Sequence, residues 1–242
     1  MKNKYYDKKY FEERNHLDLH LAESIKVLME DYELKKILDV GCGTGKLVKF
    51  FNEQGFNATG CDNSKIAIKA AKKLDEESFV VASATKLPFK KGSFDLVISI
   101  STIEHLTINE AKLFLKEAFR VLKPHGFLFL VTPNFSSPMR YILQDKWFGY
   151  SDPTHVTFFT PSSLSQLLQQ YGFGDSKLRL KSAYNVSTDL HVPSLLKKLP
   201  MPMKNLLNYL MISSPLSTWR DSFWIAAEKK EIPVTTVLKT GR

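Results

Sequence analysis

The residues best suited to hold a ligand form one glycine-rich run, Ile37-Leu38-Asp39-Val40-Gly41-Cys42-Gly43-Thr44-Gly45. The apolar residues before Gly41 predict a buried strand that feeds a tight turn. Glycines in such a turn let the backbone come within contact distance of a ligand, because a side chain there would clash with it. A helix that starts after Gly45 would point its unpaired N–H groups at the ligand, and these favour a negative group such as a carboxylate.

An acidic residue follows the next predicted strand. Asp62 comes after Gly60-Cys61 and lies 17 residues beyond Gly45, where doubly wound folds place an acid against a ribose diol. Its two carboxylate oxygens can accept both hydroxyl protons. A glycine-rich turn alone is a weak signal, but with Asp39 before it and Asp62 after it the pattern predicts a ligand that carries a ribose.

Two histidines are the candidates for proton transfer, because an imidazole suits a base at neutral pH. His105, in Ile103-Glu104-His105-Leu106, follows the fourth predicted strand, near the edge where open α/β sheets bind ligands. The alternative is that Glu104 and His105 only organise a loop. His155 lies in a predicted insertion, where it either projects into the substrate site or pins its loop by hydrogen bonds.

No metal site is expected. Cys42 and Cys61 belong to no CxxC pair or Cys/His cluster, and Glu104 with His105 supply only two ligands. The two cysteines are predicted to be small buried thiols rather than a disulfide.

The elements that would position these residues alternate between short apolar runs and amphipathic stretches. Strands are expected at 37–40, 58–61, 79–82, 94–100, 127–131, 178–183 and 222–227, and helices at 46–52, from Ser64 onward, at 109–122 and at 162–171. This order predicts an α/β fold with a doubly wound, mostly parallel, seven-stranded sheet. Residues 1–230 would form a single domain, 134–160 and 184–219 would be insertions over the site, and 231–242 a flexible tail.

Composition is that of a globular protein, with 43% hydrophobic and 24% charged residues. No apolar run approaches the ~20 residues of a membrane-spanning helix, and the charged N-terminus lacks a secretory core, so a cytoplasmic location is expected. The net charge is +9, and residues 177–242 hold 11 Lys/Arg against 4 Asp/Glu. The basic segment 192–216 is expected to pack on its own domain; the alternative is a peripheral membrane contact.

The chain resembles the class I methyltransferases that depend on S-adenosylmethionine (SAM), over roughly residues 35–175. The matching segments are ILDVGCGTGK (37–46), GCD (60–62), LPFKKGSFDLVIS (87–99), IEHL (103–106) and VLKPHGFLFL (121–130), and they look most like the ubiquinone and menaquinone branch. The resemblance implies a Rossmann-like fold and SAM as cofactor. It places Gly41, Gly43 and Gly45 against the methionine part, Asp62 on the ribose and the Ile100 backbone beside the cofactor. Asp39, Cys42 and Asn63, which flank these positions, are expected contacts as well.

One position departs from the family pattern. Many relatives have an aspartate four residues before Leu-Pro-Phe, where it bonds the adenine amine, and this chain has Ser83. The Ser83 hydroxyl or the Ala84 backbone would serve instead, with the loss of one charge-assisted hydrogen bond.

The predicted activity is methyl transfer to a small molecule, at a hydroxyl oxygen in preference to carbon or nitrogen. A nicotinamide dehydrogenase is disfavoured because the third glycine of its fingerprint falls at Lys46. An RNA methyltransferase is disfavoured because no RNA-binding module is recognisable. A non-catalytic SAM-binding protein remains the third alternative.

Overall fold

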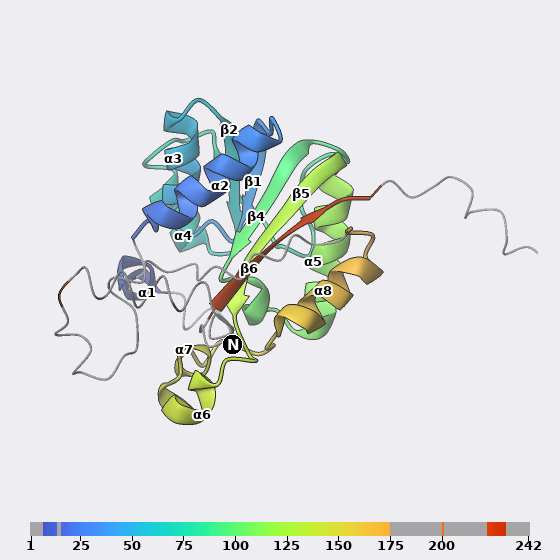
Figure 1. The fold of residues 1–242 in the computed structure, drawn as a ribbon. Coiled ribbons are helices and arrows are strands. Elements are labelled where there is room, and N and C mark those ends of the chain that lie inside the picture. Colours follow the sequence, from blue (N-terminus) through green and yellow to red (C-terminus); the bar gives the residue numbers. More distant parts are fainter. Residues whose placement is uncertain (1–6, 14–15, 175–199, 201–221, 231–242) are drawn as a thin grey trace, which may run out of the picture.

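The computed structural model describes residues 7–13, 16–174, 200 and 222–230, and every structural statement below refers to this part of the chain. Six strands form one sheet in the order β3-β2-β1-β4-β5-β6 (Figure 1). The strands are β1 Lys36–Val40, β2 Asn57–Asp62, β3 Phe79–Val81, β4 Phe94–Ile100, β5 Leu122–Pro133 and β6 Ser222–Glu228. β6 is antiparallel to β5, and all other neighbours are parallel.

Helices cover both faces of the sheet (Figure 1). On one face lie α2 Leu19–Asp31, α3 Lys46–Glu53 and α4 Lys65–Ala71, and on the other lie α5 Ile108–Val121 and α8 Pro161–Gln170. Successive strand residues point to opposite faces: Ile37 packs with α2 and α3, and its neighbour Leu38 packs with α5. The central strand β1 is therefore apolar on both sides, as in other parallel sheets, and the predicted doubly wound α/β class is confirmed.

Polar side chains cap α4 and α5, two of the helices that begin near the carboxyl edge of the parallel strands. Ser64 accepts a hydrogen bond from the Ala67 N–H and starts α4, as predicted from the sequence. Thr107 and Glu110 form a reciprocal capping box that starts α5. These caps satisfy N–H groups that the first helical turn leaves without partners, so they fix where the chain leaves β2 and β4.

The first insertion lies beyond the carboxyl end of β5 and contains α6 Met139–Leu143, the 3₁₀ turn η3 Gln144–Lys146 and α7 Phe148–Ser151 (Figure 1). Trp147 is fully buried and its ring lies 4.9 Å from that of Tyr150 and 6.4 Å from those of Phe135 and Phe158. These aromatic residues pack against one another and hold the insertion together.

Three expectations from the sequence need correction or fall outside the described residues. The described sheet has six strands rather than seven, because the range 178–183 predicted for the remaining strand is not among the described residues. β5 begins at Leu122 rather than at 127, since a bulge opposite β4 accommodates Pro124-His125-Gly126 between two paired stretches. Apart from residue 200, the second insertion 184–219, with its basic segment 192–216, also lies outside the described part, as does the tail 231–242.

The small α1 Lys8–Glu13 and the 3₁₀ turn η2 Ile103–His105 complete the described elements. Within the described ranges, every helix is too short or too polar to cross a bilayer.

Candidate active site

A cavity of about 670 Å³ lies at the carboxyl ends of β1, β2 and β4. Its volume is within the range of small-molecule sites, roughly 300–1,000 Å³. Of the predicted cofactor-binding and catalytic residues, all but Gly45 line it: Asp39, Gly41, Cys42, Gly43, Asp62, Asn63, Ser83, Ala84, Ile100, His105 and His155. Residues far apart in the sequence thus meet at the edge where open α/β folds bind ligands.

The three glycines of the turn have the left-handed backbone, with φ of +81° at Gly41, +53° at Gly43 and +81° at Gly45. A Cβ on Gly41 would overlap the Thr102 side chain, and one on Gly45 would overlap the ring of Phe79. A Cβ on Gly43 would meet no atom within 4 Å. Gly41 and Gly45 therefore permit close packing inside the protein, whereas Gly43 borders the open space of the cavity.

Asp62 links this turn to the end of β2. One carboxylate oxygen accepts the Gly43 N–H at 3.0 Å, and the other accepts the Ser64 N–H at 2.8 Å. Burial raises the pKa of Asp62, and the backbone N–H groups of Ser64, Gly43 and Asn63 oppose that shift. The carboxylate holds the glycine turn in place and also lines the cavity.

Asp39 is 5% exposed and lies behind the turn, at the cavity wall. Burial, with a smaller contribution from the charge of Asp62, raises the pKa of Asp39 from 3.8 to about 7. A positively charged group in the cavity would favour its ionised form. The two carboxylates, with the open space beside Gly43, therefore suit a ligand that carries both hydroxyls and a positive charge, as SAM does.

The loop after β4 forms the opposite wall. The Ser99 hydroxyl donates to the Val40 carbonyl oxygen at 3.0 Å. The Thr102 hydroxyl donates to the Ile100 carbonyl oxygen at 3.1 Å. Ser101 between them has φ of +49°, a strained conformation for a residue with a side chain. These contacts tie the ends of β1 and β4 together where both meet the cavity.

Both candidate histidines are oriented through Nδ1. Thr154 donates its hydroxyl proton to Asp152 at 2.5 Å, so its oxygen accepts from His105 Nδ1 at 2.9 Å. His155 Nδ1 donates to the Gly149 carbonyl oxygen at 2.8 Å. In each neutral ring the proton-accepting atom is then Nε2, and the two ring centroids are 4.7 Å apart.

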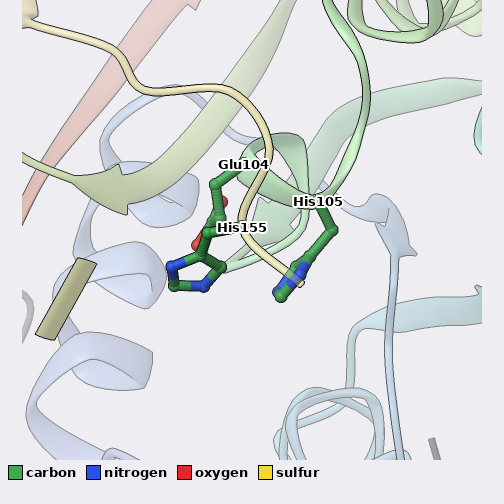
Figure 2. A group of neighbouring side chains, drawn as sticks. All are labelled: Glu104, His105 and His155. Atoms are coloured by element: carbon green, nitrogen blue, oxygen red, sulfur yellow. The ribbon is translucent and has the colours of Figure 1, made fainter. Parts of the chain in front are cut away.

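The carboxylate beneath the histidines is buried. Glu104 is 1% exposed, its Oε2 accepts the Thr132 hydroxyl at 3.1 Å, and its Oε1 has no hydrogen-bond partner among the described residues. Burial raises the pKa of Glu104 to about 8. The Val156 and Thr157 N–H groups donate to the Glu104 carbonyl oxygen at 2.9 and 3.1 Å, and these bonds bring His155 beside His105 (Figure 2).

Sequence reasoning missed Asp152 and Thr154. Burial alone would raise the pKa of Asp152, but hydrogen bonds from Thr154 and the charges of His155 and His105 outweigh it, and the pKa is lowered. The only signal was the short polar run Asp152-Pro153-Thr154-His155 inside an aromatic insertion. That run gives no sign that its partner is His105, 47 to 50 residues earlier in the chain.

Cys42 and Cys61 are free thiols; Cys61 is buried, as predicted, whereas Cys42 is only partly buried. Burial raises the pKa of both thiols well above the ordinary value, so neither is a ready nucleophile at neutral pH.

Comparisons with known proteins agree with this geometry. A family model described as a methyltransferase domain matches residues 38–130. The ubiquinone biosynthesis O-methyltransferase of Pelagibacter ubique is 29% identical over 197 residues, which cover 72% of this chain and 79% of that protein. The chloroplastic tocopherol O-methyltransferase of Arabidopsis thaliana is 37% identical over 164 residues, 61% of this chain and 46% of the relative.

The fold recurs in solved structures. A SAM-dependent methyltransferase from Archaeoglobus fulgidus superposes with a TM-score of 0.60 at 21% identity, and the match covers 86% of this chain and 94% of the Archaeoglobus chain. At that identity the likeness shows the fold. Together with the family model, the relatives and the cavity, it leads to one conclusion: residues 38–130 match a methyltransferase domain, the chain is similar to class I SAM-dependent methyltransferases of the ubiquinone type, and its cofactor is SAM.

Proposed function

We propose that this methyltransferase acts on a hydroxyl oxygen of a small molecule. The observation that carries the proposal is the pair of oriented histidines, His105 and His155, at the wall of the cofactor cavity. Methyl transfer to a hydroxyl requires removal of its proton, which a positioned imidazole accelerates. The names of two relatives, O-methyltransferases of ubiquinone biosynthesis and of tocopherol, support the same acceptor atom.

In this proposal the glycine turn and the two aspartates hold the cofactor. Asp62 binds the ribose hydroxyls, Ser83 or the Ala84 backbone meets the adenine, and Asp39 faces the positive charges of the methionine part. Each of these residues lines the cavity. Bound SAM supplies a methyl group that its sulfonium has already activated, so the protein contributes mainly alignment.

The histidines act on the acceptor. As the acceptor oxygen bonds to the methyl carbon, the carbon–sulfur bond breaks and its electron pair stays on sulfur. The hydroxyl proton passes to Nε2 of His105 or His155 and from there to solvent. Thr154 and Asp152 stabilise the protonated His105, because its Nδ1–H bond leads to a carboxylate.

The test is turnover by His105→Ala and His155→Ala, assayed as release of S-adenosylhomocysteine with a panel of phenols and aliphatic alcohols. A base should lose about 10²–10⁴-fold in kcat, with cofactor affinity unchanged. His125→Ala is the matched control, because His125 is exposed and pairs with Glu228 outside the cavity. The proposal fails if neither cavity variant lowers turnover.

Transfer RNA in the same assay tests a second candidate function, RNA methylation, which the net charge of +9 favours. Methylation of RNA with no activity on any hydroxyl compound would contradict the proposal.

A further inference from the structure

Three side chains with metal-binding atoms meet beside the cofactor cavity. Glu104, His105 and His155 each place one ligand atom within 4.8 Å of those of the other two. Glu104 and His105 come from η2, and His155 comes from the segment that follows α7 (Figure 2). Two imidazole nitrogens and one carboxylate oxygen form a recurrent donor set for divalent transition metals.

Each of these three side chains is oriented by a hydrogen bond through one of its polar atoms. His105 is bonded through Nδ1 to Thr154, and His155 through Nδ1 to Gly149. Glu104 is bonded through Oε2 to Thr132. Histidine ligands in metal sites are oriented in this way, with one ring nitrogen donating to an oxygen and the other on the metal.

An independent observation points to a missing ligand. Glu104 is 1% exposed, and its Oε1 has no hydrogen-bond partner in the described part of the chain. A buried polar atom without a partner is costly, and native structures satisfy nearly all of them. A cation between Glu104 and the histidines would satisfy it. The neighbouring Asp152 carboxylate, which interacts with both rings, adds to the negative potential there.

We propose that Glu104, His105 and His155 bind one first-row transition-metal dication, of the Mn²⁺ or Zn²⁺ class. Two nitrogen donors disfavour Mg²⁺ and Ca²⁺, which prefer oxygen ligands. Three protein ligands leave a coordination position for water or for an acceptor oxygen on the cavity side, where both histidines lie. The sequence supplied only Glu104 and His105 as a pair, so the expectation of no metal site is revised.

The site also deepens the proposed function, on which this step rests. An acceptor hydroxyl bound to the cation would have a lowered pKa, and its proton would leave to solvent. With the cation bound, the histidines would act on the acceptor through it, whereas in the cation-free protein they act as the bases of the proposed function. Cation binding itself needs no acceptor and can be measured without activity.

The experiment is calorimetric titration of the full, tag-free chain, stripped with EDTA, with MnCl₂, ZnCl₂ and MgCl₂ in turn. We expect one equivalent of Mn²⁺ or Zn²⁺ to bind, more tightly than Mg²⁺. Glu104→Gln, His105→Ala and His155→Ala should each weaken binding at least about tenfold, and Thr154→Val, which removes an orienting bond, roughly 10–100-fold. The control is His125→Ala, which removes one partner of the exposed His125–Glu228 pair and should leave the cation affinity unchanged.

Because Glu104 is buried, folding of each variant is checked by binding of S-adenosylhomocysteine, and His155→Ala provides the decisive comparison if Glu104→Gln fails to fold. No saturable binding by the wild-type chain, or unchanged affinity in His155→Ala, would overturn the site. If the wild-type chain binds no cation but still methylates a hydroxyl compound after EDTA treatment, the metal site is refuted and the proposed function stands.

Discussion

In the proposed function, Asp39 and Asp62 together bind a cofactor that carries both hydroxyls and positive charge. Asp39 is the more buried, and its pKa is about 7 instead of 3.8. Because the folded protein holds this proton more tightly than the unfolded chain, stability of the free protein falls as pH rises from 3.8 to 7, and stays lowered above 7.

If Asp39 faces the cofactor as proposed, cofactor binding should depend on pH. SAM favours the ionised form of Asp39, so its affinity should increase as pH rises through 7, about tenfold for each unit by which the cofactor lowers that pKa. Asp39→Asn should remove this increase, weaken SAM binding at pH 8 and raise the free energy of unfolding of the free protein there. Calorimetry at pH 6 and 8 and urea unfolding measure the effects; an unchanged pH profile in Asp39→Asn would contradict the assignment.

Asp62→Asn should weaken SAM binding roughly ten- to a hundredfold, because hydrogen bonds to a charged group contribute about 1.5–3 kcal/mol. The amide keeps one acceptor oxygen, so it cannot accept from both Gly43 and Ser64 as the carboxylate does. Asp75→Asn is the matched control, since Asp75 also accepts from nearby residues, Glu77 and Ser78, but is exposed. Equal SAM affinity in the two variants would speak against a cofactor role for Asp62.

Ser83→Asp should tighten SAM binding. Ser83 lines the cavity, and its oxygen accepts the Thr85 N–H at 3.2 Å, a local bond that an aspartate can keep. The carboxylate would add one charge-assisted bond to the adenine amine. Calorimetry with S-adenosylhomocysteine decides: an affinity that is unchanged or lower removes Ser83 from the adenine site.

At the scale of elements, the strand–turn–helix unit from β1 to α3 makes the clearest mechanical prediction. Gly43→Ala and Gly55→Ala both place a side chain at positive φ with no atom within 4 Å, so both should cost about 1 kcal/mol of stability. Only Gly43→Ala should also weaken SAM binding, because only Gly43 borders the cavity.

Gly45→Ala is the third variant of this comparison, with Gly43→Ala and Gly55→Ala. Its Cβ would overlap Phe79, so it should destabilise the protein by more than Gly55→Ala. Urea unfolding gives the stabilities and calorimetry the affinities. Equal SAM affinity in Gly43→Ala and Gly55→Ala would contradict the placement of the cofactor beside the turn.

The elements themselves were predictable because their periodicity is local. The alternation of apolar runs and amphipathic stretches located β4 at Phe94–Ile100 and the Ser64 cap of α4 to the residue. The same rule misjudged β5, since Pro124 and Gly126 are typical of a loop, yet a bulge lets pairing resume on both sides.

The geometry of the histidines was not predictable, because the first insertion has no period. His155 lies beside His105 because Val156 and Thr157 donate backbone hydrogen bonds to Glu104 and Thr154 bonds to His105. Backbone bonds between segments some 50 residues apart leave no pattern in either segment. The sequence therefore named both histidines but could not bring them together or reveal the burial of Glu104.

At the scale of the whole molecule, the basic segment 192–216 lies outside the described residues apart from residue 200, and its role stays a prediction. We expect it to pack on its own domain, so that the chain does not sediment with anionic vesicles at low salt. Salt-sensitive co-sedimentation, lost when Lys197, Lys198 and Lys204 are changed to glutamine, would instead favour a membrane contact.

The measurement that tests the account most directly is calorimetric titration of the purified chain with S-adenosylhomocysteine. We predict saturable binding at one molecule per chain, and at a hundredfold excess over Kd a stabilisation of about 2.7 kcal/mol, which raises Tm by roughly 5–10 °C. Absence of both binding heat and thermal shift in a folded sample would contradict the assignment of the cavity to the cofactor.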